Sequence, residues 1–135
     1  MNLSESVTTV LDAQVVFGRI FYEEFFRSCP EARPYFDGAD MERQALLLTM
    51  SLSIIEQYHR NLRGAVELYL QHLGHTHHHR GIPPRLFPLW SEAMLIALAR
   101  FLGEAWTLEL AAQWREAIRQ VSEVMLRGYD RRAVI

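Results

Sequence analysis

Apolar side chains recur every three or four residues along almost the whole of this chain, and that spacing restricts the folds open to it. A period of 3.6 residues gathers apolar side chains on one side of a helix, whereas a half-buried strand needs strict alternation. No Asn-Gly or Asp-Gly turn joins two alternating segments, so the usual signal of a β-hairpin is missing. The pattern therefore predicts an all-α protein of about six or seven helices.

Size and charge narrow the class of protein further. The 135 residues predict one domain, 1–135, large enough to bury a core without disulfides or structural metals. A formal net charge of −2 and the lack of a basic block argue against nucleic-acid binding. The start of the chain does not resemble a signal peptide, and the longest uncharged run, 44–55, is shorter than the roughly 20 residues of a spanning helix. We expect a cytoplasmic protein that does not enter a membrane.

Capping residues and prolines predict where the first helices begin and end. Ser4 or Ser6 can cap a first helix, which runs through an aromatic-rich segment and ends at Cys29-Pro30. It ends there because a residue before proline avoids the α region. A short helical turn and a loop follow, and Asp40 is placed to cap a helix over 41–58.

Glycines predict the ends of the later helices. A helix is expected over 64–80, with Gly81 as its C-terminal stop. The next helix begins near Pro84–Pro88 and ends at Gly103, and Thr107 can cap the last helix.

The stretch LGHTHHHRGIPP holds four of the six histidines within five positions. An advance of 100° per residue puts His77 within about 40° of Leu70 and Leu73, on the apolar side of its helix. The same rotation places His75 and His79 about 160° from His77, and His78 about 100° from it. One histidine of the cluster is therefore expected to face the core.

The outward histidines form pairs at helical spacing, which could hold a surface metal ion. The stretch offers no carboxylate or cysteine to complete a tetrahedral set, so we expect these side chains to be solvated. The residues alone leave two interpretations of His77. It is either a core histidine that bonds a carbonyl or a ligand.

Four segments resemble the bacterial globins. LGHTHHHRGIPP is similar to their proximal segment, with its iron-binding histidine followed by Gly-Ile, and RLFPLWSEAML to the start of the next helix. FYEEFFRSCPEARPYFDGADMERQ resembles their distal half, and FLGEAWTLELAAQWREA their junction between the last two helices. The resemblance covers about residues 4–129, in the right order. It is strongest to the single-domain bacterial haemoglobins and the haem domains of flavohaemoglobins, and it implies a globin fold whose helices sandwich a haem.

The resemblance implies a role for each matching residue. His77 matches the proximal ligand of haem iron, and Phe36 the phenylalanine that packs on the haem. Tyr22 matches the distal tyrosine, whose hydroxyl can donate a hydrogen bond to bound dioxygen, and Gln44 the residue at the distal gate. The remaining cofactor contacts that we expect are Leu48, Leu73, Ile82 and Phe87. Since the chain has one cysteine, the haem would be noncovalent haem b.

Alternatives stay open at several of these positions. Tyr22 could be a core aromatic whose hydroxyl bonds a carbonyl, and Gln44 could face solvent. Gln44 shares a helix face with Leu48, which favours a pocket position. His78 would become the ligand if its helix were rotated.

The chain departs from the flavohaemoglobin pattern on the proximal side. Where that group has a supporting tyrosine and glutamate, this chain has Phe87 and Tyr129. A carboxylate there would raise the basicity of the imidazole, so its replacement weakens the case for nitric oxide dioxygenase and for peroxidase-like chemistry. The chain also has no GxGxxG motif, so turnover would need a separate reductase.

The function implied is a haem b globin that reversibly binds dioxygen, as well as carbon monoxide and nitric oxide, with oxygen binding or transport as its role. The alternatives are a nitric oxide dioxygenase with an external reductase, a haem-based gas or redox sensor, and a haem-free helical module. A monomer or a homodimer is expected.

Overall fold

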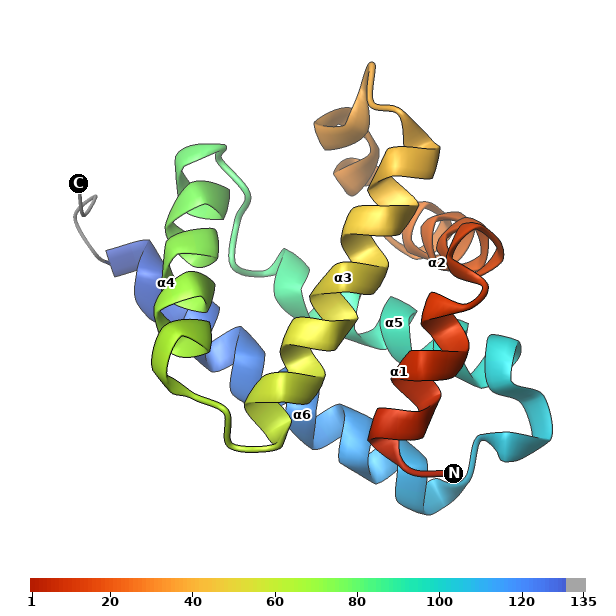
Figure 1. Ribbon diagram of the computed structural model, residues 1–135. Coiled ribbons are helices and arrows are strands. Elements are labelled where there is room, and N and C mark those ends of the chain that lie inside the picture. Colours follow the sequence, from red (N-terminus) through yellow and green to blue (C-terminus); the bar gives the residue numbers. More distant parts are fainter. Residues whose placement is uncertain (131–135) are drawn as a thin grey trace.

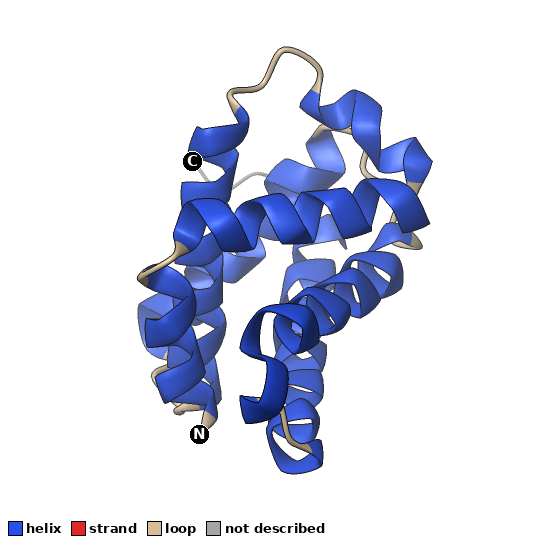
Figure 2. Ribbon diagram, turned by 90° about the vertical axis from the view of Figure 1, so that its right-hand side faces the viewer, coloured by secondary structure: helices blue, strands red, loops and turns tan. Residues whose placement is uncertain are grey.

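The computed structural model describes residues 1–130, and within this range it contains helices and loops but no strands (Figures 1 and 2). The all-α prediction is confirmed. The α-helices are α1 Leu3–Leu11, α2 Gln14–Ser28, α3 Met41–His59, α4 Gly64–His79, α5 Leu86–Leu102 and α6 Leu108–Arg127. Three short 3₁₀-helices join or extend them: η1 Pro30–Phe36, η2 Gly103–Ala105 and η3 Gly128–Asp130.

Most of the predicted helix boundaries are confirmed by their caps. The Asp40 carboxylate accepts hydrogen bonds from two backbone N–H groups in the first turn of α3, and the Thr107 hydroxyl accepts one from Leu110 at the start of α6. Gly81 follows α4 with φ of 80°, a left-handed conformation that favours glycine and ends the helix.

The prediction of one continuous first helix is wrong, and so is its cap. Asn2 caps α1 in a capping box with Glu5, and the backbone leaves the helical region at Ala13 before α2 begins. No proline or glycine causes this break. Instead, contacts with other helices set the direction of α1, because Ser4 bonds Glu56 of α3 at 2.7 Å.

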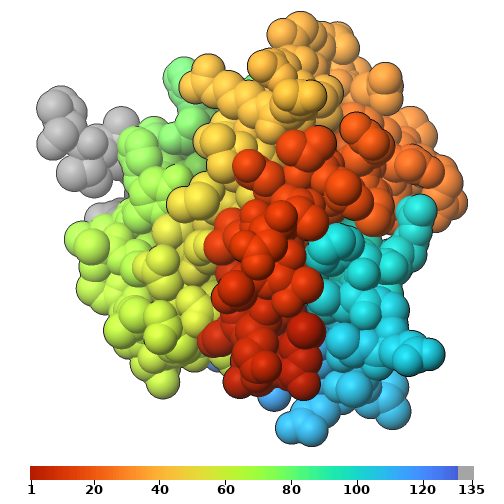
Figure 3. Space-filling model, turned by 45° about the vertical axis from the view of Figure 1, so that its right-hand side comes forward, coloured from red at the N-terminus to blue at the C-terminus, as the bar shows by residue number. Residues whose placement is uncertain are grey.

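Helix α1 lies across the surface between α3 and the C-terminal helices, as the red segment of Figure 3 shows. The Trp114 indole N–H of α6 donates to the Ser6 hydroxyl of α1 at 2.9 Å, deep in the core. Ser6 in turn donates to the Leu3 carbonyl at 2.6 Å. These bonds satisfy polar groups that would otherwise be costly to bury.

The core lies where α2 packs on α5 and where α5 in turn packs on α6. Its aromatic part includes Phe17 and Phe21 of α2, both fully buried. Phe17 meets Phe101 edge-on with ring centroids 5.5 Å apart, and Phe21 lies 5.7 Å from Trp90. These contacts fix the side of α2 that also carries Tyr22.

The stretch Leu86–Ala105 is long and apolar enough to pass as a membrane span by length and composition. It is not an uncharged run, because Glu92, Arg100 and Glu104 interrupt it. In the fold, α5 buries six of its side chains, Met94 and Leu98 completely. A helix in a protein core has the same composition, so the stretch is weak support for a membrane segment.

Helix α4 lies beside α6 (Figure 1), and a glycine sets their separation. A Cβ added at Gly74 would lie 1.8 Å from the Met125 carbonyl oxygen. Backbone meets backbone at this crossing, so the lack of a side chain at Gly74 lets α4 lie this close to α6. The position of His77, three residues further along α4, follows from this contact.

Candidate functional site

His77 lies in the last turn of α4, half-buried, and its Nδ1 is 2.8 Å from the Leu73 carbonyl oxygen. A carbonyl only accepts, so Nδ1 must carry the proton and donate it, which leaves Nε2 with the free lone pair. Burial lowers the pKa of His77 below its usual value, and the Leu73 bond opposes this in part. The imidazole is therefore neutral at neutral pH, with Nε2 available as a ligand.

This geometry combines the two sequence interpretations of His77. The histidine does bond a carbonyl, as a core histidine would, but that bond occupies only Nδ1. Nδ1 donation to a carbonyl is also what orients a metal-binding imidazole and fixes its tautomer. The donor set therefore fits haem.

The other histidines of the cluster do not all point outward. His78 and His79 are exposed as predicted, and the His78 ring lies 5.0 Å from that of Tyr129. The prediction for His75 is wrong, because His75 is half-buried and its Nδ1 is shielded from solvent. The reason is that α6 and η3 cover this side of α4 as well. Among residues 1–130, no three His, Cys, Asp or Glu side chains form a group that could hold a metal ion.

Two tyrosines hold the segment that follows α4. The Tyr35 hydroxyl of η1 donates to the Gly81 carbonyl at 3.0 Å, and Arg80 donates back to the Tyr35 carbonyl at 3.2 Å. From the other side, the Tyr129 hydroxyl donates to the Ile82 carbonyl at 2.8 Å. These bonds hold the end of α4, and with it His77, between η1 and η3.

Tyr129 and Phe87, where the sequence departs from the flavohaemoglobin pattern, lie together on the His77 side of the molecule. Tyr129 bonds a backbone carbonyl, and its ring meets Phe87 edge-on at 5.8 Å. The hydrogen bond of His77 goes to Leu73, with no carboxylate involved. Leu73, Ile82 and Phe87 are each half-buried on this side of the molecule.

Tyr22 and Phe36, each expected at the haem from the resemblance, lie in contact with each other. Tyr22 is 8% exposed, and its ring meets that of Phe36 edge-on at 5.3 Å. Burial raises the pKa of Tyr22 far above its usual value, so the hydroxyl keeps its proton. Among the described residues, none accepts a hydrogen bond from this hydroxyl, so the structure contradicts the alternative of a core tyrosine bonded to a carbonyl.

Gln44 and Leu48 lie on α3 as predicted. Gln44 is half-buried in the first turn, and Leu48 is buried one turn further on. Leu52 and Ile55 continue the same buried face. The shared face is confirmed, whereas direct contact of Gln44 with a ligand stays a prediction.

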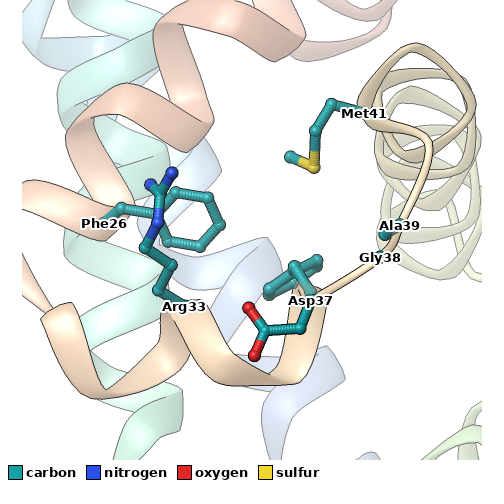
Figure 4. A pocket seen from close by; sticks show the side chains of 7 residues that line it. Phe26, Arg33, Asp37, Gly38, Ala39 and Met41 are labelled. Atoms are coloured by element: carbon teal, nitrogen blue, oxygen red, sulfur yellow. The ribbon is translucent and has the colours of Figure 1, made fainter.

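Two cavities lie beside Tyr22 and Phe36 (Figure 4 shows the first). The first, about 230 Å³, is lined by Phe26, Arg33, Phe36, Asp37, Gly38, Ala39 and Met41. The second, about 330 Å³, reaches Tyr22 and is lined also by Val15, Gly18, Arg19, Glu23, Phe26, Arg33, Met41, Glu42 and Ala45. Sequence reasoning missed Phe26, Arg33 and Met41, which line both. Of these three, only Phe26 could have been predicted from the sequence, since it lies one helical turn from Tyr22.

Comparison with known proteins adds to this geometry. The family model described as Globin matches residues 19–125. The chain is 25% identical over 107 residues to a flavohemoprotein of Rhizobium meliloti, covering 78% of this chain and 26% of the relative. It is 23% identical over 129 residues to a flavohemoprotein of Bacillus subtilis, covering 93% and 32%. The chain thus spans between a quarter and a third of the length of these relatives.

A solved structure is similar over nearly the whole chain. It is a Pseudomonas aeruginosa protein described as structurally highly homologous to a human haemoglobin. The TM-score is 0.80 and the identity 27%, and the match covers 95% of this chain and 98% of the other.

Proposed function

Because the chain belongs to the globin family, which implies a haem cofactor and diatomic gas ligands, we propose that it binds haem b noncovalently through His77 and reversibly binds dioxygen. Carbon monoxide and nitric oxide would bind at the same site, and oxygen binding or transport would be the role. The observation that carries the proposal is the His77 imidazole, which is neutral, oriented by Leu73 and free at Nε2.

When bound, haem would supply an iron that His77 would hold and that binds diatomic gases. The chain's own residues would do the rest. His77 presents Nε2, and Tyr35 and Tyr129 hold the end of its helix. Tyr22 offers a protonated hydroxyl with no competing protein acceptor in the described range. Phe36, Leu48, Leu73, Ile82 and Phe87 would exclude water from the cofactor, and Gln44 would stand at the distal gate.

Addition of hemin tests this proposal directly. The purified protein should take up one equivalent and develop a strong Soret band. After reduction it should show the spectrum of five-coordinate ferrous haem, because His77 is the one axial ligand that we assign. A chain that leaves hemin in its free form would contradict the proposal.

Replacing Tyr22 with phenylalanine should speed dioxygen release about tenfold or more, since a hydrogen bond to a charged group contributes about 1.5–3 kcal/mol. Stopped-flow measurement of dissociation checks this. Carbon monoxide is less polar when bound, so its release should change much less.

Tyr69→Phe is the matched control, because Tyr69 is 50% exposed on α4 and lines neither described cavity. An unchanged dioxygen release rate in Tyr22→Phe would remove Tyr22 from the proposed site.

Nitric oxide dioxygenation with a separate reductase is the second candidate, and the likeness to flavohemoproteins favours it. The hydrogen bond of His77 favours reversible dioxygen binding over nitric oxide dioxygenation. A carbonyl partner makes His77 less basic than a carboxylate would. We also propose that the chain is a cytoplasmic single domain and that it is a monomer or a homodimer. No observation in residues 1–130 favours a sensor.

A further inference from the structure

We propose that the two cavities between α2 and the start of α3 form an access route by which diatomic gases reach Tyr22 from the surface. This inference rests on the proposed function and deepens it, because it names the path to the same site. The path is distinct from one past Gln44.

The two cavities meet at three side chains. Phe26 of α2, Arg33 of η1 and Met41 of α3 line both of them. Figure 4 shows the Arg33 side chain against the Phe26 ring, with Met41 pointing in from the opposite side. The larger cavity then continues inward to Tyr22, and the smaller reaches Phe36, whose ring contacts Tyr22.

The three shared side chains are able to move. The Arg33 guanidinium lies 5.1 Å from the Phe26 ring centroid, and such a contact is weak where solvent reaches it. Met41 is 38% exposed, and an unbranched thioether side chain changes rotamer readily. Small side-chain movements would therefore open or narrow the path at this point.

The inner end of the route is rigid by comparison. Gly18 of α2 and Ala45 of α3 both line the larger cavity, and a Cβ added at Gly18 would lie 2.3 Å from the Ala45 Cβ. The two helices touch there, so their separation is fixed by backbone.

The lining becomes less polar from the outside inward. The charged residues of the larger cavity, Arg19, Glu23, Arg33 and Glu42, are all exposed, whereas Gly18, Tyr22 and Ala45 are buried. A neutral, apolar diatomic gas gains by leaving water for such a lining. The two cavities have volumes of about 330 and 230 Å³ and are open to solvent on one side.

Met41→Trp should narrow the route at the shared point. In the haem-loaded protein we expect carbon monoxide association after flash photolysis to slow about fivefold or more. Dissociation should slow by the same factor and leave Kd unchanged, because a barrier on a path acts equally in both directions. Met41→Ala should have the opposite effect on both rates.

Leu46→Trp is the matched control, since Leu46 is 44% exposed on the same helix and lines neither cavity. It should leave both rates unchanged. Slower association in Gln44→Trp together with an unchanged rate in Met41→Trp would overturn the proposal. So would a change of Kd in Met41→Trp without a change in association rate.

Xenon gives a readout that does not depend on gas binding at haem. Under xenon pressure, before hemin is added, the NMR methyl signals of Met41 and Ala45 should shift while those of Leu46 do not. A xenon response without a Soret band would sink the proposed function but keep the cavities as gas sites. A Soret band with no xenon response at Ala45 would overturn the route alone.

Discussion

Replacing His77 with alanine is expected to abolish the five-coordinate ferrous spectrum of the hemin-loaded protein. The variant loses the only nitrogen that we assign to the iron, and nothing next to it can substitute. His78 is turned toward Tyr129, and His75 lies on the side of α4 that faces α6 and η3. Absorption spectra of the ferric and ferrous forms, with titration of hemin affinity, check this.

His79→Ala is the matched control, because His79 is exposed two residues away on the same helix. It should keep the native spectrum. Free imidazole should partly restore the axial ligand to the His77→Ala variant, which separates loss of a ligand from loss of the fold. An intact five-coordinate spectrum in His77→Ala would contradict our assignment of the ligand.

Gly74→Ala should lower the free energy of unfolding by about 1–3 kcal/mol, which is the usual cost of overpacking. The new Cβ would fall 1.8 Å from the Met125 carbonyl oxygen, so α4 and α6 must move apart. The helix propensity of alanine opposes this with about 1 kcal/mol, but it does not remove the overlap. Urea unfolding followed by circular dichroism measures the difference.

The control for Gly74→Ala is His72→Ala, an exposed position on the same helix. Its effect should stay within about 0.5 kcal/mol. A Gly74→Ala protein as stable as the parent would mean that the close crossing of α4 and α6 does not persist in solution.

Local signals predicted much of the fold because they depend on few neighbours. A side-chain acceptor before a helix, as at Asp40 and Thr107, satisfies the first N–H groups wherever that helix packs. Asn2 followed by Glu5 is the same kind of signal, and it caps α1 in place of the serines predicted to do so. The break at Ala13 had no such signal, because contacts of α1 with α3 and α6 set it.

The candidate site shows the same limit. The apolar period placed His77 inward, and the structure agrees. The same apolar period predicted that His75 faces solvent, which is wrong. The reason is that α6 approaches α4 closely at Gly74, and a glycine adds nothing to a hydrophobic pattern. The cavities beside Tyr22 could not be predicted, since they depend on Arg33 and Met41 meeting Phe26 across three elements.

Helix α4 buries only Leu70 and Gly74, whereas α5 and α6 bury six residues each. Local opening is least costly where few apolar contacts must break, so this helix can open without dismantling the core around α2, α5 and α6. A ligand that binds only the closed form shifts that equilibrium by mass action. Raising the ligand concentration should therefore protect the segment that holds His77 from hydrogen exchange and proteolysis more than it protects the rest of the fold.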